Sequence, residues 1–222
     1  MCPAPSDFSS LSALRPADLT ELIKRQTLHF QHPLSNQRID ALTCWLEQLV
    51  RWNMKIDLTA ATSGAQLVDL CVADALVLSK SIDRGQEVVD VGTGAGGPGL
   101  ALALVRPDLR LTLVEPQKKR VAFLRSVIGL VQGSAGCTAQ VIAERAESLV
   151  PHRFDCAIAR AVLDPAAWLD LGTRLVRRGG RVAVLLTQSQ VFRPAPTCEA
   201  SVTYTWPLQS LTRRLQWYRT AS

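Results

Sequence analysis

The sequence lacks the features of a membrane protein or a repeat protein. None of its apolar runs approaches the length of a membrane span, and its first ten residues show no basic region followed by an apolar stretch. Internal repeats and low-complexity tracts are also missing. We therefore expect a cytoplasmic protein with no membrane partner. Because 47% of its 222 residues are hydrophobic, the chain can build one large domain, or a domain with a small appendage.

The cysteine pattern argues against a metal site or a disulfide framework. There is no CxxC pair and no Cys/His cluster with zinc spacing, and a chain of this size does not need disulfides. We predict free, mostly buried thiols and no bound metal. The six cysteines are Cys2, Cys44, Cys71, Cys137, Cys156 and Cys198.

Lysine is scarce in an otherwise basic chain. Of the 25 lysines and arginines 20 are arginine, and with 19 acidic residues the formal charge is +6. The arginine fork suits bidentate contacts with phosphate. The balance therefore favours a polyanionic partner such as nucleic acid, although plain solubility gives the same balance.

Strand patterns are absent from the first third of the chain. Apolar residues recur at helical spacing over residues 15–30, 34–53 and 66–80, with Ser35 as a plausible N-cap of the second segment. We predict an N-terminal helical cap over residues 1–80. It precedes a domain over residues 81–222, and the two form one compact unit.

From residue 87 onward, short β-rich runs alternate with helical segments. Continuous apolar strands in such an alternation predict a doubly wound α/β fold with a parallel sheet covered on both faces. Two further strands follow each other at the end of the chain without a helix between them. We therefore expect a Rossmann-like sheet of seven strands with the last strand antiparallel.

A glycine-rich loop follows the first of these strands in "VVDVGTGAGGPGLALALV", residues 88–105. Gly92, Gly94 and Gly97 fit the G-x-G-x-x-G spacing, which permits a tight turn and the close approach of a ligand to the backbone. The next strand ends in Glu115, whose carboxylate can accept hydrogen bonds from both hydroxyls of a ribose. The loop therefore predicts a cofactor that carries a nucleoside.

The acid before the loop distinguishes two cofactors. A dinucleotide places its pyrophosphate at the helix N-terminus, whereas S-adenosylmethionine has cationic sulfonium and ammonium groups that favour acidic neighbours. Asp90 stands two residues before Gly92, and "DVGTGAG", which includes Thr93, is similar to the D/E-x-G-x-G-x-G signature of class I methyltransferases. S-adenosylmethionine is the expected cofactor.

Motifs that the chain lacks narrow the range of atoms that could accept the methyl group. The Asn/Asp-Pro-Pro-aromatic motif typical of exocyclic amine methylation is missing, and the one cysteine near the fourth or fifth strand, Cys156, is better explained as a core thiol. A ring nitrogen such as guanine N7 carries its own lone pair and needs no general base. Catalysis then depends mainly on alignment and electrostatics.

Several motifs together resemble one family. "RWNMKIDLTA", "VVDVGTGAGGPGLALALVRP", "TLVEPQKKRVAFLRSV", "ERAE", "FDCAIARAV" and "RRGGRVAVL" occur in the order found in the RsmG family, also called glucose-inhibited division protein B. The resemblance covers residues 51–185. It implies N7 methylation of a guanine in 16S ribosomal RNA, with the small-subunit RNA or the subunit as the partner. We expect the protein to be a monomer.

The resemblance also implies roles for individual residues. The loop residues are expected to contact the cofactor, with Glu115 at its ribose and Ala146 and Glu147 at its adenine. Arg160 is expected beside both the cofactor and the methyl acceptor. Arg160 is thus the expected catalytic residue, and the expected RNA contacts are Lys119, Arg120 and Arg145. The loop residues are Asp90, Gly92, Thr93, Gly94 and Gly97.

The chain departs from the family at several positions. Asp57 replaces the usual asparagine, and Leu186 and Thr187 replace the Lys-Gly that usually ends the fifth strand. The family's "H-x-x-D-S" element reads Cys71 to Ala75 here and keeps only its aspartate. These changes leave open an S-adenosylmethionine-binding relative with weak or no turnover, or a methyltransferase with another acceptor. An NAD-dependent oxidoreductase is the remaining alternative, because it shares the glycine loop.

Overall fold

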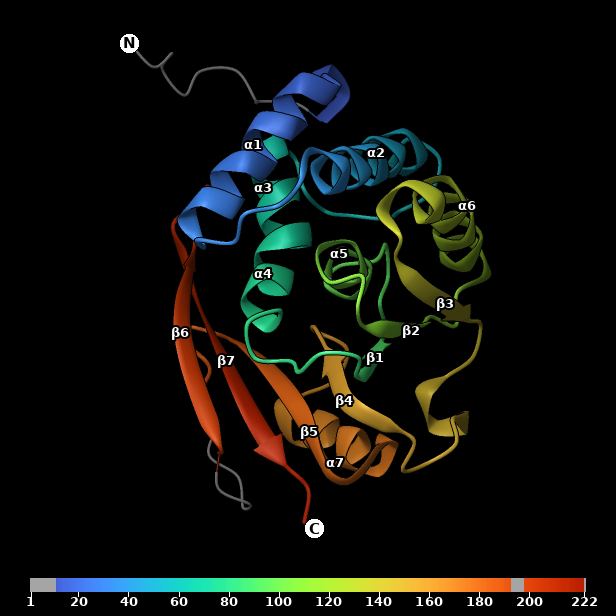
Figure 1. Ribbon diagram of the computed structural model, residues 1–222, viewed down its shortest axis with the longest axis vertical. Helices are drawn as coiled ribbons and strands as arrows, with labels where there is room; N and C mark the ends of the chain where they lie inside the picture. The colour runs from blue at the N-terminus through green and yellow to red at the C-terminus, as the bar shows by residue number, and fades with distance from the viewer. Residues whose placement is uncertain (1–10, 193–197, 222) are drawn as a thin grey trace.

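The structure is a computed structural model that describes residues 11–192 and 198–221, apart from the side chains of Ser12 and Ser134. Cys2, predicted to be a free thiol, lies outside these residues. Helices of the N-terminal third lie against one side of a sheet, and the chain ends in a two-stranded hairpin at the edge of that sheet (Figure 1).

Three helical segments form the expected cap. After a 3-10 turn at Leu11–Ala13 come α1 (Pro16–His29) and α2 (Asn36–Asn53), both with one apolar face buried. The third segment, expected over 66–80, begins two residues earlier and is not a regular helix. It consists of α3 (Gly64–Val68), a π-helical turn (Asp69–Ala73) and α4 (Asp74–Leu78).

All seven expected strands form one sheet. Its order is β3-β2-β1-β4-β5-β7-β6, and β7 runs antiparallel to both of its neighbours. The other neighbouring strands are parallel, so the predicted class I fold with an antiparallel last strand is confirmed. The strands are β1 (Glu87–Val91), β2 (Arg110–Val114), β3 (Thr138–Ile142), β4 (Phe154–Ala159), β5 (Val176–Thr187), β6 (Ala200–Trp206) and β7 (Leu211–Arg219).

The sheet separates two apolar cores. The larger core joins the cap with α5 (Gly99–Val105), α6 (Lys118–Ala135) and one face of the sheet, while the smaller core lies between the other face and α7 (Pro165–Leu175). In Figure 1, α7 lies on the side of β4 and β5 away from the other helices. A 3-10 turn at Ala146–Ser148 is the only helical element between β3 and β4 in this described part of the chain.

Alternation along each strand sends neighbouring residues into different cores. Val88 packs in the larger core and Val89 in the smaller one. In β4, Cys156 and Ile158 face the larger core while Ala157 and Ala159 face the smaller one. Cys156 is fully buried, as expected for a core thiol, and the five described cysteines are all free.

Candidate active site

The sheet changes its winding direction between β1 and β4. The helix that follows β1 covers one face, and the helix that follows β4 covers the other, so the two loops diverge and leave a crevice at the carboxyl ends of these strands. Ligands of open α/β sheets bind in such a crevice. Three cavities lie there, and they contain most of the residues predicted from the sequence.

The glycine loop turns tightly at the end of β1. Gly92 and Gly94 have φ of +64° and +60°, where residues with side chains are disfavoured. A Cβ on Gly92 would lie 2.4 Å from Val162, and one on Gly97 would lie 3.2 Å from the Arg160 guanidinium. The cap also supports this loop, because the Trp45 indole donates to the Ala95 carbonyl at 3.0 Å. The glycines therefore keep the cavities on both sides of the loop open.

Asp90 is buried beneath the loop and does not line the cavities. Its Oδ2 accepts the Gly99 amide at 2.8 Å, while its Oδ1 has no hydrogen-bond partner among the described residues. A Cβ on Gly99 would lie 2.4 Å from Oδ2, so this contact requires glycine at the start of α5. Burial raises the pKa of Asp90 to about 6, although hydrogen bonds to the carboxylate oppose the shift. Asp90 thus anchors α5 to β1.

Glu115 lies where the end of β2 meets the glycine loop. It is 2% exposed, and its Oε2 accepts the Gly94 amide at 3.1 Å while its Oε1 accepts the Gln117 amide at 2.8 Å. Arg120 Nη1 lies 3.9 Å from Oε2. The carboxylate predicted from the end of the second strand is therefore held in place by backbone amides on both sides.

Gly92 separates two of the cavities. One, of about 190 Å³, lies toward β2 and β3 and has Val114, Pro116 and Ala146 among its walls, with Arg145 and Glu147 also lining it. The other, of about 130 Å³, lies toward the cap. It is lined by the glycine loop and by Leu49, Leu58, Thr59, Leu70, Cys71, Arg120 and Arg160.

Arg160, at the end of β4, is held by a buried network. Its Nη1 donates to the Leu70 carbonyl, and to Asp74 Oδ2 at 3.2 Å. The other oxygen of Asp74 accepts the Tyr204 hydroxyl at 2.6 Å and the Trp206 indole at 2.9 Å. Burial, with the Asp74 carboxylate adding to it, raises the pKa of Tyr204, so this hydroxyl remains a neutral donor. One carboxylate thereby joins the cap, Arg160 and the terminal hairpin.

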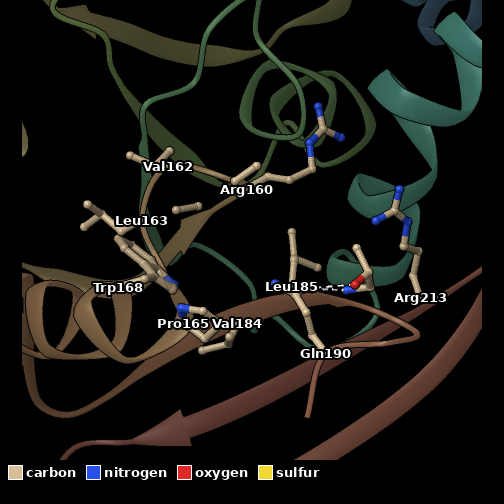
Figure 2. A pocket seen from close by; sticks show the side chains of 12 residues that line it. Arg160, Val162, Leu163, Pro165, Trp168, Val184, Leu185, Gln190 and Arg213 are labelled. Carbon is tan, nitrogen blue, oxygen red and sulfur yellow. Dashed lines mark hydrogen bonds between the residues drawn. The ribbon is translucent and has the colours of Figure 1, made fainter. Parts of the chain in front are cut away.

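The third cavity, of about 140 Å³, opens on the other side of Arg160 (Figure 2). Figure 2 shows Val162, Leu163 and Trp168 along one side, and the guanidinium groups of Arg160 and Arg213 on the side nearer to α4. None of the described residues that line it is an aspartate, glutamate, histidine, cysteine, lysine or tyrosine. The cavity therefore has an apolar wall facing two guanidinium groups, and its described lining offers no side chain of ordinary basicity that could accept a proton.

The three cations predicted to contact RNA lie in different surroundings. Lys119 is exposed in the first turn of α6. Arg120 is half-buried and lines the cavity toward the cap, where its Nη2 donates to the Asp57 carbonyl at 3.5 Å. Arg145 is exposed at the rim of the cavity that Ala146 and Glu147 also line.

Residues at which the chain departs from the family pattern also have clear locations. Cys71 lines the cavity toward the cap, and burial raises its pKa to about 12, so it remains a thiol. Leu186 is 2% exposed and packs in the smaller core. Among the described residues, the cations that line the third cavity are Arg160 and Arg213. No motif in the sequence pointed to Arg213.

The geometry fits a cofactor that carries a nucleoside. A glycine-rich loop crosses the crevice, a buried carboxylate follows β2, and Arg160 lines both the cavity toward the cap and the third cavity. In residues 11–192 and 198–221, no group of three or more His, Cys, Asp or Glu side chains could hold a metal ion. No helix of that part of the chain is both long and apolar enough to cross a membrane.

Fold and site together define a class I methyltransferase that uses S-adenosylmethionine. Solved structures share the fold at low sequence identity. An S-adenosylmethionine-dependent methyltransferase from Aquifex aeolicus has a TM-score of 0.50 and 13% identity, over 68% of this chain and 90% of that one. A predicted O-methyltransferase from Agrobacterium tumefaciens has a TM-score of 0.50 and 16% identity, over 67% and 81%.

Sequence comparison identifies the family. Residues 38–192 match GidB, rRNA small subunit methyltransferase G, and the chain belongs to this family. Relatives named ribosomal RNA small subunit methyltransferase G include one from Anaeromyxobacter dehalogenans, 34% identical over 64% of this chain and 66% of its own length. Another, from Myxococcus xanthus, is 35% identical over 65% and 67%. The matches thus span about two thirds of these relatives, and the resemblance noted in the sequence is confirmed.

Proposed function

We propose that the protein transfers the methyl group of S-adenosylmethionine to N7 of a guanine in 16S ribosomal RNA. The observation that carries this proposal is the third cavity, which adjoins Arg160 and has no general base among the described residues that line it. Guanine N7 attacks through its own lone pair, so no protein group needs to remove a proton. Family membership supports the RNA substrate.

The two cavities beside Gly92 supply the cofactor site in this proposal. Ala146 and Glu147 would bind the adenine, Glu115 would hold the ribose hydroxyls, and Gly92, Thr93, Gly94 and Gly97 would accommodate the rest of the molecule. When bound, S-adenosylmethionine supplies an electrophilic methyl group on its sulfonium. Asp90 supports the site indirectly, because its carboxylate is buried away from the cavities. It fixes α5 and the glycine loop in place.

Arg160 is the proposed catalytic residue. Arg160 lines both the cavity toward the cap and the third cavity, which is the acceptor cavity in this proposal. It can therefore align the base with the methyl group. Asp74 restrains this guanidinium by an ion pair at 3.2 Å. Lys119, Arg120 and Arg145 bind phosphates of the RNA at the same edge of the sheet. The protein acts as a monomer in the cytoplasm, without a metal.

Nucleotide mapping tests the acceptor. We expect mass spectrometry of 16S ribosomal RNA to find one 7-methylguanosine that is missing when the gene is deleted and restored by the wild-type gene. The Arg160→Met gene should not restore it, although the purified variant should still bind S-adenosylmethionine. A methyl group at another atom of the RNA, or an unchanged RNA, would refute the proposed acceptor.

Calorimetry tests the cofactor. We expect S-adenosylmethionine or its demethylated product to bind and NAD not to bind. Gly92→Val should abolish binding, because a side chain at this positive φ would collide with Val162 and fill the space of the ligand. Gly136→Ala has a positive φ in open space at the end of α6 and serves as a control for backbone strain. Equal affinity in wild type and Gly92→Val would remove the loop from the site.

A further inference from the structure

A further cavity adjoins the acceptor cavity at the end of β5. It has a volume of about 400 Å³ and lies between the end of β5 and the turn that joins β6 to β7. The two cavities share Thr187 and Arg213. The remaining lining residues are Gln188, Ser189, Ser210, Leu211 and Thr212.

Arg213 stands at the boundary between the two cavities. Its position is set by strand register, because Arg213 on β7 pairs with Thr187 at the end of β5. The guanidinium carbon lies 4.0 Å from the centre of the Trp206 ring. Trp206 is itself held by its hydrogen bond to Asp74, so Arg213 rests on the same buried support that restrains Arg160.

The donors of Arg213 have no protein acceptor among residues 11–192 and 198–221. Its side chain makes no hydrogen bond or ion pair there, and its Nε is buried without a partner. The terminal nitrogens of the guanidinium, which also lack a protein partner in these residues, are therefore available to an acceptor that a ligand brings. No aspartate or glutamate belongs to the described lining of either cavity.

The polar groups around Arg213 suit a tetrahedral anion. Four residues with hydroxyl groups, Thr187, Ser189, Ser210 and Thr212, line the same cavity. The Thr187 hydroxyl already donates to Gln190 Oε1 at 3.2 Å, and its oxygen lies 3.2 Å from the Ser189 hydroxyl. Hydroxyl and guanidinium donors without a carboxylate are typical of phosphate sites.

We propose that the cavity lined by Thr187, Ser189, Ser210, Thr212 and Arg213 binds a phosphodiester group next to the acceptor guanine. The inference rests on the proposed function, because it requires an RNA acceptor in the adjoining cavity. In a nucleotide only the sugar separates base and phosphate, so a base in the acceptor cavity, against Val162 and Trp168, brings its phosphate toward Arg213. Arg213 thereby fixes the register of the RNA strand, whereas Arg160 aligns the base.

A matched pair of variants separates this site from general charge. Arg213→Met keeps the aliphatic stem on Trp206 but removes the charge, and Arg214→Met removes the same charge from the neighbouring residue, which lines neither cavity. We expect Arg213→Met to weaken binding of unmethylated 16S ribosomal RNA about 10- to 100-fold. The salt dependence of log K should fall by about 0.7–0.9. Arg214→Met should change affinity less than about threefold, and both variants should bind S-adenosylmethionine like the wild type.

A modified RNA identifies the group that Arg213 contacts. An oligonucleotide with the mapped guanine carries one neutral methylphosphonate, placed in turn on the 5′ and the 3′ side of that guanine. One placement should weaken wild-type binding as much as Arg213→Met does, and should cost the variant nothing further. Additive losses at both placements would overturn the proposal, as would equal effects of Arg213→Met and Arg214→Met. A wild-type protein that neither binds nor methylates RNA would instead refute the proposed function.

Discussion

At the scale of single residues, the buried Asp90 carboxyl makes stability depend on pH. Burial raises its pKa to about 6 in the folded protein, against an ordinary value of 3.8. Between pH 4 and pH 6 the unfolded chain therefore releases a proton that the folded protein keeps. The free energy of unfolding should fall as pH rises through this window, by up to about 1.4 kcal/mol per pH unit, and level off above it.

The Asp90→Asn variant isolates this effect. Its amide oxygen can still accept the Gly99 amide, and it no longer titrates. We expect urea unfolding between pH 4 and pH 6 to show a flatter slope for Asp90→Asn than for the wild type. Asp69, whose pKa burial also raises to about 6, should leave part of the slope in place. Identical slopes in the variant and the wild type would refute a raised pKa of Asp90.

The positions of site residues could be predicted where a motif carries them. The glycine loop, Glu115 and Arg160 stand directly after strands that the sequence marks clearly, and the structure brings them to one crevice. Arg213 could not be found this way. It comes from the last strand, and only the pairing of β7 with β5 brings it beside Thr187. The structure thus adds Arg213 to Arg160 at the acceptor cavity.

At the scale of elements, α7 packs against β5 through a glycine. A Cβ on Gly172 would lie 2.6 Å from Val182 Cγ1, so the helix can approach the sheet only without a side chain there. We expect Gly172→Ala to destabilise the fold by about 1–3 kcal/mol, because α7 must move away from the strand. Chemical unfolding monitored by circular dichroism gives the value.

A second glycine provides the matched control. Gly129 lies in α6, where an added Cβ meets nothing within 4 Å. Gly129→Ala should therefore stabilise the protein by about 0.5–1 kcal/mol, since alanine loses less backbone entropy in a helix. A stabilising Gly172→Ala, or two changes of the same sign, would contradict the close packing of α7.

Element types followed from periodicity, but two details did not. The helix expected over residues 66–80 contains the π-helical turn, which places Asp69 and Asp74, five residues apart, toward the same hairpin. Asp69 accepts the Gln209 amide at 2.8 Å, and Asp74 accepts Tyr204. These partners lie far away in the sequence, so local propensity cannot reveal the irregular turn. The order β5-β7-β6 likewise depends on contacts between distant segments.

At the scale of the whole molecule, the cap and the sheet share one core. Leu42 and Trp45 of α2 belong to the same buried cluster as Leu100 of α5 and Phe123 of α6. The boundary near residue 80, expected between a cap and a domain, therefore does not divide the apolar core. We predict one cooperative unfolding transition, with tryptophan fluorescence and circular dichroism giving the same midpoint.

The isolated sheet domain tests whether the cofactor site depends on the cap. A fragment of residues 81–222 should fail to bind S-adenosylmethionine, since it lacks Trp45 and the packing of α2 beneath the glycine loop. In the full chain, Trp45→Phe keeps an aromatic ring but loses the hydrogen bond to Ala95, and it should bind the cofactor more weakly without losing the fold. A fragment that binds as tightly as the full chain would show that the cap is dispensable.

The terminal hairpin also dictates when the site can be complete during biosynthesis. Tyr204 and Trp206, which hold Asp74, and Arg213, at the acceptor cavity, all belong to the last two strands. A nascent chain that has exposed its glycine loop still lacks these groups until both strands of the hairpin have also been synthesised. However early the glycine loop folds, the site is therefore completed only at this later stage of synthesis.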